Sequence, residues 1–107
     1  KPRCKLMNSS KDVVKECAHN KSAIGYSGIA YASDEVRVVP IKKNEAAPAV
    51  MPSVESVLDK SYPISRPLYM YTNGEPTGDI KDYIDWIKSD AGQKVLAAKR
   101  YVPLRKM

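Results

Sequence analysis

The stretch from Ser61 to Leu104 constrains the fold most strongly, because prolines, turn signals and helical periodicity divide it into short elements. Two prolines hold an extended lead-in, and the alternation of side chains over Leu68–Thr72 predicts a strand. Asn73-Gly74 and Pro76-Thr77-Gly78 are turn signals that end this strand. The second half of the chain is therefore expected to combine strand and helix.

A helical pattern follows these turns. Apolar residues at i, i+3, i+4 and i+7 form the stripe of an amphipathic helix, namely Ile80, Tyr83, Ile84 and Ile87. Ser89 and Asp90 break this helix and cap another, which is predicted from about Ala91 to Lys99. Two consecutive helices are expected near the end of the chain.

Two further helices are predicted from their N-terminal caps. Ser9 is followed three residues later by Asp12, as in a capping box, and the helix that begins there carries an apolar face of Val13, Val14, Cys17 and Ala18. Ser53 caps a short helix over Val54–Asp59.

Two strands are predicted between these helices, over Ala23–Ser27 and over Glu35–Ile41. Gly25 and Gly28 allow the backbone to approach closely either another part of the fold or a ligand. The order helix, strand, strand, helix, strand, helix, helix predicts a small mixed sheet covered by helices, in an α/β or α+β fold.

Length and charge limit the possible functions. A chain of 107 residues fits one small domain, and its net charge is +6. The ends, residues 1–21 and 99–107, carry eight net positive charges, whereas residues 22–98 carry two net negative charges. No basic stripe is interleaved with aromatic residues, so we expect no nucleic-acid partner. No apolar run approaches the roughly 18 residues of a membrane span, and the absence of a signal peptide does not place the chain in the cytoplasm.

The sequence offers no complete catalytic or metal site. Two cysteines and one histidine do not make a four-ligand zinc site, and His19 is expected at the exposed end of a helix. We therefore expect neither an enzyme nor a bound cofactor. Cys4 and Cys17 either form a disulfide or remain as an exposed thiol and a buried thiol, and the sequence leaves both states open.

Anion binding is the one local chemistry that the residues suggest. The helix that opens at Asn8-Ser9-Ser10 offers free backbone N–H groups, two hydroxyls and the positive end of a dipole, with Lys5 and Lys11 close by. Ordinary N-capping by Ser9 is the simpler interpretation of the same residues.

Four blocks in order closely resemble the C-terminal part of the periplasmic phosphate-binding proteins, which serve bacterial phosphate ABC transporters. The blocks read A-I-G-Y at Ala23–Tyr26, Y-P-I-S-R-P-L-Y-M-Y-T-N-G at Tyr62–Gly74, D-Y-I-D-W-I-K-S-D-A-G-Q-K-V at Asp82–Val95, and Y-V-P-L at Tyr101–Leu104. The resemblance covers about residues 8–104.

The resemblance implies a two-lobed fold of the type II periplasmic binding proteins, whose α/β lobes close on phosphate. It implies that residues 1–35 belong to the second lobe, that residues 36–48 form a hinge or return strand and a linker, and that residues 49–107 are the C-terminal part of the first lobe. The implied partners are inorganic phosphate, in the intact protein, and the permease of an ABC transporter. The implied location is periplasmic or extracytoplasmic, free or anchored as a lipoprotein.

The family's ligand motifs do not occur in this chain. The phosphate ligands of that family include a Ser-Gly-Thr loop and an arginine. In this chain Ser27-Gly28 is followed by Ile29, and Arg66 belongs to the R-P-L-Y block, outside the family's ligand motif. No ligand residue is therefore transferred. Asn8 and Ser9 match the region that follows a family ligand loop, so we expect them near the cleft.

Two hypotheses follow. The first is a fragment of an extracytoplasmic phosphate-binding protein, which lacks the main ligand loops and self-associates or swaps domains through exposed residues. The candidates for this exposed surface are Ile24, Tyr26, Leu68 and Met70. The second hypothesis is an autonomous small basic adaptor or binding module. The oxyanion that the parent prefers, the oligomeric state and the natural or artificial origin of the fragment stay open.

Overall fold

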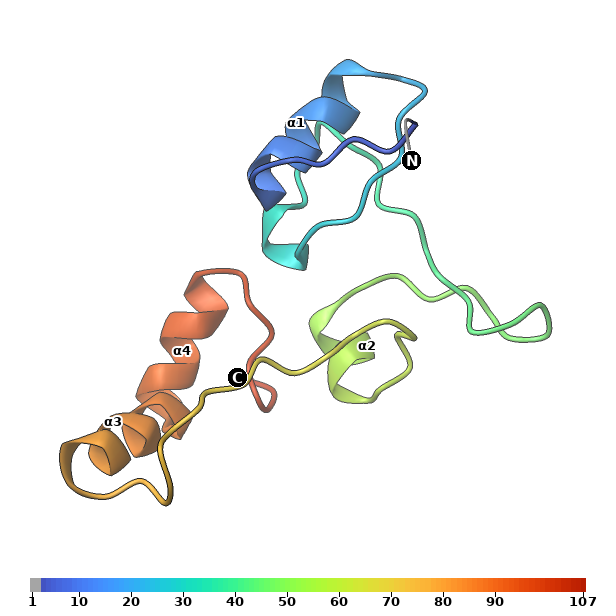
Figure 1. The fold of residues 1–107 in the computed structure, drawn as a ribbon. Helices are drawn as coiled ribbons and strands as arrows, with labels where there is room; N and C mark the ends of the chain where they lie inside the picture. The colour runs from blue at the N-terminus through green and yellow to red at the C-terminus, as the bar shows by residue number, and fades with distance from the viewer. Residues whose placement is uncertain (1–2) are drawn as a thin grey trace. The chain divides into compact units, whose positions relative to one another are not determined.

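The computed structural model describes residues 3–107, and its regular structure in this range is helical. Figure 1 shows the helices α1 (Ser10–His19), α2 (Val54–Leu58), α3 (Gly78–Lys88) and α4 (Asp90–Ala98), and a short 3-10 turn, η1, covers Ile29–Tyr31. The chain divides into two units, Lys1–Val39 and Pro40–Met107. Each unit is described by itself.

Helix α1 begins and ends as the sequence predicts. The Ser9 hydroxyl oxygen accepts a hydrogen bond from the Asp12 backbone N–H at 3.2 Å, which satisfies one of the N–H groups that the first turn leaves without an intrahelical partner. At the other end the N–H of Asn20 donates to the Glu16 carbonyl at 3.0 Å. The predicted capping role of Ser9 is confirmed.

The segment after α1 returns along the helix as a single extended chain. A Cβ placed on Gly25 would lie 2.8 Å from Val13 Cγ1 and 3.1 Å from Cys17 Sγ, so only glycine permits this approach. Near the start of the helix, the Ser27 hydroxyl donates to the Ser10 carbonyl at 3.1 Å. The close approach that the sequence predicts for Gly25 is thus made to helix α1.

The predicted strand over Ala23–Ser27 is wrong. Gly25 and Ser27 face α1, whereas the side chains of Ile24 and Tyr26 are exposed. A strand requires a neighbouring strand to pair its backbone N–H and C=O groups, and residues 3–107 supply none to this segment.

The predicted strand over Glu35–Ile41 is reduced to one pair of residues. Ile41 and Val50 form an isolated antiparallel bridge, with N–H···O distances of 3.0 and 2.8 Å. Between them the Asn44 side chain accepts from the N–H groups of Ala46 and Ala47, which fixes the tight loop that joins the two. The residues after Ile41 thus form a loop, and the predicted strand over Glu35–Ile41 does not extend beyond this bridge.

Helix α2 is held by a reciprocal capping box. The Ser53 hydroxyl accepts from the Ser56 N–H at 3.0 Å, and the Ser56 hydroxyl accepts from the Ser53 N–H at 2.9 Å. Ser56 also donates to the Met51 carbonyl at 2.8 Å, and it is buried although it is polar. The predicted cap at Ser53 is confirmed.

Helices α3 and α4 meet at a corner built on Ser89. Ser89 ends α3 and caps α4, because its hydroxyl accepts from the Gly92 N–H at 3.3 Å and donates to the Trp86 carbonyl at 2.5 Å. The predicted break and re-cap at Ser89 is confirmed.

The predicted strand over Leu68–Thr72 is also wrong. These residues connect α2 to α3 with no backbone hydrogen bond to any residue of the described chain, and Gly74 follows with φ +80° in the predicted turn. No strand forms within residues 3–107, so the predicted small mixed sheet is absent from this range. The reason is the same in each case, since extended segments with the right composition have no strand beside them.

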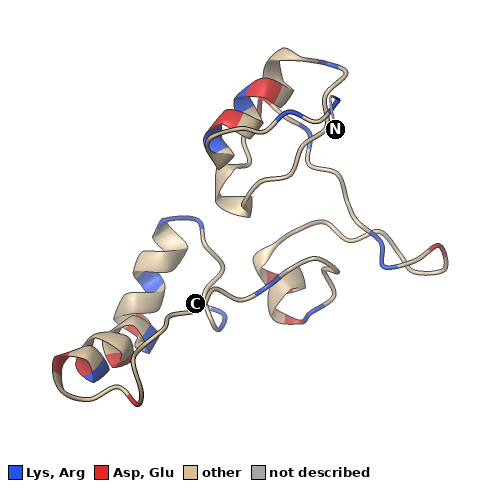
Figure 2. Cartoon of the chain, in the orientation of Figure 1, with Lys and Arg blue, Asp and Glu red and all other residues tan. Residues whose placement is uncertain are grey.

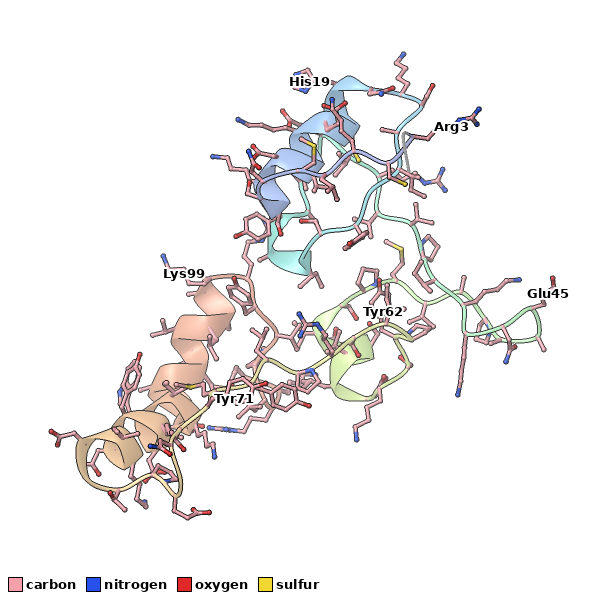
Figure 3. The ribbon with its side chains drawn as sticks, in the orientation of Figure 1. Arg3, His19, Glu45, Tyr62, Tyr71 and Lys99 are labelled. Atoms are coloured by element: carbon pink, nitrogen blue, oxygen red, sulfur yellow. The ribbon has the colours of Figure 1, made fainter. Side chains whose placement is uncertain are left out.

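Within residues 3–107, Pro103 is the one apolar side chain that is buried, and no aliphatic, aromatic, methionine or cysteine side chain joins it in a core. The stripe predicted on α3 exists, but Ile80 and Tyr83 are exposed and Ile84 and Ile87 are only half-buried. Side chains project freely from most of the ribbon (Figure 3). The helices are thus specified by local signals more than by packing.

Candidate functional site

The first candidate is the N-terminus of α1, where Asn8 and Ser9 are both exposed. No residue among 3–107 accepts a hydrogen bond from the backbone N–H of Ser10 or Lys11, so two donors at the positive end of the helix dipole remain available. The Ser9 oxygen already accepts from Asp12. This arrangement is able to attract an anion, but it does not enclose one.

The charge around this helix is mixed. Lys5 Nζ lies 3.2 Å from Glu16 Oε1 and forms an ion pair with it, so this lysine is engaged by the helix rather than directed to an anion. Figure 2 shows acidic and basic residues interleaved along α1. Exposed charges in this arrangement are screened by salt and hold an anion only weakly.

His19 lies at the C-terminal end of α1, where Figure 3 labels it. Its Nδ1 is 2.7 Å from the Lys15 carbonyl oxygen, which ties the ring to the last turn of the helix. His19 thus lies at the exposed end of the helix, as the sequence predicts.

The remaining polar clusters do not form a chemical site within the described residues. Asp85 pairs with Lys81 at 2.5 Å on the mixed-charge surface of α3, and no group of three His, Cys, Asp or Glu residues among 3–107 is placed to hold a metal ion. Cys4 and Cys17 are both free thiols, the first exposed and the second half-buried.

A cluster that the sequence did not reveal lies at the corner between α3 and α4, where the C-terminal segment docks. Gln93 is 1% exposed, and its amide donates to the Ile87 carbonyl at 2.8 Å while its oxygen accepts from the Leu104 N–H at 2.7 Å. The buried side chain of Gln93 thereby joins the end of α3 to Leu104, which lies eleven positions after Gln93. We call Gln93, Asp90, Leu104 and Arg105 the corner clasp.

Arg105 completes the corner clasp. Its guanidinium donates from Nε and from one terminal nitrogen to the Asp90 carboxylate, and from the other terminal nitrogen to the Lys88 carbonyl at 3.1 Å. The hydrogen bonds from Arg105 to the Asp90 carboxylate, together with the positive charge of Arg105, hold the pKa of Asp90 below its usual value. The sequence contains the blocks S-D-A-G-Q and Y-V-P-L, but no pattern in either block predicts the contact between Gln93 and Leu104.

An open hollow of about 520 Å³ lies in the second unit, between α2 and the C-terminal segment. Its walls include apolar side chains of Val54, Leu58 and Leu104 and charged side chains of both signs. No buried side-chain nitrogen or oxygen in the described part of the chain lacks a hydrogen-bond partner, so no unsatisfied polar atom points to a ligand there. No helix of residues 3–107 has the length and apolar character of a membrane span.

Comparison with known proteins identifies relatives for nearly the whole chain. A model of the PBP superfamily domain matches residues 4–91. The phosphate-binding protein PstS of Pseudomonas aeruginosa is 32% identical over 108 residues, which cover 97% of this chain and 33% of that protein. PstS 2 of Streptococcus agalactiae is 34% identical over 92% of this chain and 32% of its own length, and PstS of Bacillus subtilis is 33% identical over 94% and 32%.

The chain thus spans about a third of the length of the curated relatives it matches. No solved structure matches it significantly.

Proposed function

The chain belongs to the PBP superfamily of periplasmic-binding-protein-like domains, and on this premise we propose that it is part of an extracytoplasmic solute-binding protein that captures inorganic phosphate for an ABC importer. The observation that carries the proposal is the 32% identity with phosphate-binding protein PstS across 97% of the chain. The predicted resemblance to the phosphate-binding proteins is confirmed by this match. The names of these relatives describe phosphate binding, which agrees with a role other than catalysis.

We propose that the chain supplies parts of two lobes. Residues 1–35 would belong to the second lobe, residues 36–48 would cross the hinge, and residues 49–107 would complete the first lobe. The division of the structure between Val39 and Pro40 falls inside the proposed hinge segment, which supports this arrangement. Closure of such lobes around a ligand requires a crossing segment that absorbs the backbone change.

The role proposed for this chain is scaffold more than ligand contact. Burying a phosphate requires many hydrogen bonds and compensating charge, because an underpaired buried ion is costly. The α1 N-terminus offers two exposed N–H groups, and the family's ligand motifs do not occur in the sequence. We place Asn8 and Ser9 beside the proposed cleft, and we expect the isolated chain to bind phosphate weakly and in a salt-dependent manner.

The exposed apolar side chains agree with this scaffold role. Ile24, Tyr26, Leu68 and Met70 are exposed, as predicted, and α3 leaves Ile80 and Tyr83 of its apolar stripe exposed. In a complete binding protein of the relatives' length, further sequence would cover such faces, and the assembled lobes would deliver phosphate to the permease outside the cytoplasm.

Calorimetry on the protein expressed from the complete reading frame tests the proposal, with phosphate and sulfate as alternative ligands. We expect phosphate to bind with measurable heat and to raise the melting temperature, because a ligand that binds only the folded state stabilises it. The 107-residue chain under the same conditions is the matched comparison and should bind far more weakly. Negligible heat and an unchanged melting temperature of the complete protein would refute phosphate capture.

The reading frame itself separates this proposal from the small basic adaptor. An upstream signal peptide and a Ser-Gly-Thr loop would support the proposed fragment of a binding protein. A start codon immediately before Lys1 would favour the adaptor.

A further inference from the structure

Both cysteines of the chain lie in the N-terminal unit, on two segments that contact each other. Cys4 is exposed on the segment that precedes α1, and Cys17 is half-buried on the helix. Both are free thiols in this structure. The 107 residues contain two cysteines, so within this chain each has only the other as a partner for a disulfide.

The ion pair between Lys5 and Glu16 joins the neighbours of the two cysteines. Lys5 follows Cys4, Glu16 precedes Cys17, and 3.2 Å separates the charged atoms of the pair. Figure 1 shows the segment before α1 running alongside that helix. The fold therefore returns the segment of Cys4 to the part of α1 that carries Cys17.

The two thiols differ in how firmly the structure holds them. Cys17 Sγ packs against the chain that follows α1, because it lies 3.1 Å from the position that a Cβ would take on Gly25. Cys4 is held less firmly, since the bond from Lys5 to Glu16 is the one hydrogen bond of residues 3–8 within the described chain. A disulfide joins Cα atoms about 4.4–6.8 Å apart, and the exposed segment is free to adjust to that distance.

An oxidising compartment favours the bond, and this step rests on the extracytoplasmic location that belongs to the proposed function. Thiols persist in reducing compartments, whereas secreted proteins commonly pair their cysteines. Formation of the bond removes one proton and one electron from each thiol. A disulfide of the thiol-oxidising class accepts both electrons and both protons and becomes a dithiol.

We propose that Cys4 and Cys17 form a disulfide in the complete protein and tie the segment before α1 to that helix. The closed ring contains Asn8 and Ser9, which the proposed function sets beside the cleft. The bond restricts the backbone conformations of this ring, and it thereby restrains the chain that leads into the N-terminus of α1.

Peptide mapping tests the bond in the protein secreted from the complete reading frame, with free thiols blocked before digestion. Cleavage after arginine and lysine without reductant should give residues 4–5 joined to residues 16–21, and reduction should separate the two peptides. Recovery of both cysteines as blocked thiols would overturn the proposal. Cys4 or Cys17 joined to a cysteine outside these 107 residues would overturn it as well.

Substitution of the exposed cysteine measures the restraint that the bond provides. Cys4→Ser in the complete protein should lower the melting temperature by several degrees and leave Cys17 as a thiol that reacts after denaturation. Lys5→Ala is the matched control, because it removes only an exposed ion pair of the same segment and should change the melting temperature little. Equal melting temperatures of Cys4→Ser and the unsubstituted protein would contradict the restraint.

Phosphate calorimetry on the same preparations separates this inference from the proposed function. Free cysteines in a protein that binds phosphate would remove the disulfide and leave phosphate capture in place. A mapped disulfide in a protein that binds no phosphate would refute phosphate capture and leave the bond established.

Discussion

At the scale of single residues, Gly92 determines the corner between α3 and α4. A Cβ at this position would lie 2.4 Å from the carbonyl oxygens of Trp86 and Ile87, and these are backbone atoms that cannot turn aside. The corner clasp depends on this approach, because the Gln93 amide bonds the same Ile87 carbonyl.

Gly92→Ala is therefore expected to open the corner, although alanine favours helix over glycine by about 1 kcal/mol. Overpacking against fixed backbone costs about 1–3 kcal/mol, so the clash should outweigh the gain in helix propensity. Hydrogen exchange of the Leu104 amide is the measurement, and its protection should fall.

Gly28→Ala is the matched control for that substitution. Gly28 has φ −65°, and the nearest atom to an added Cβ, Tyr31 Cδ2, is 3.6 Å away, so alanine fits there. Loss of Leu104 protection in both variants, or in neither, would contradict the role assigned to Gly92.

At the scale of elements, the sequence located the helices well and the strands poorly. Ser9, Ser53 and Ser89 act through hydrogen bonds to residues three positions away, so their capping roles are written in local sequence. A strand depends on a partner, and the β-favouring composition of Leu68–Thr72 does not show whether one is present.

The same division applies to the candidate site. The exposed cap at Ser9 was predictable, because it follows from neighbouring residues. The contact of Gln93 with Leu104 was not, since no periodicity or cap links two residues eleven positions apart in different elements.

The docking of the C-terminal segment on α4 should depend on pH through Asp90. Its pKa is lowered by the hydrogen bonds and charge of Arg105, with a smaller contribution from Lys94. A carboxyl whose pKa is depressed in the folded state contributes stability above its unfolded pKa and loses it as the pH falls through the lowered value. The protection factor of the Leu104 amide should therefore stay constant from neutral pH to the usual range of aspartate and fall at more acid pH.

Substitutions separate the contribution of Asp90 to this pH dependence from the contributions of other carboxyl groups. One of these is Asp59, whose pKa is lowered by hydrogen bonds from Ser61. Asp90→Asn should reduce the protection at neutral pH and flatten its acid dependence. Asp85→Asn removes only the pair with Lys81 on α3 and should leave the Leu104 profile unchanged. An unaltered acid fall in Asp90→Asn would show that another group controls docking.

At the scale of the whole molecule, the chain exposes far more surface than its mass requires. Its accessible surface is 9376 Å², whereas a compact protein of this mass exposes about 6,000 Å². Two separate compact units with the lengths of Lys1–Val39 and Pro40–Met107 would still expose only about 7,100 Å² in total. The excess therefore does not depend on how the two units are placed, and it arises because apolar side chains within each unit lack a cover.

The isolated chain should consequently unfold without strong cooperativity. Cooperative melting and a large heat-capacity change come from burying apolar surface, and Pro103 is the one apolar side chain that is buried among the described residues. We expect calorimetry of the dilute 107-residue chain to give a broad transition with a van't Hoff enthalpy that disagrees with the calorimetric one. A sharp two-state transition of the dilute chain, with a denaturant dependence typical of a compact domain of this length, would mean that the chain builds a core of its own and would count against its role as part of a larger binding protein.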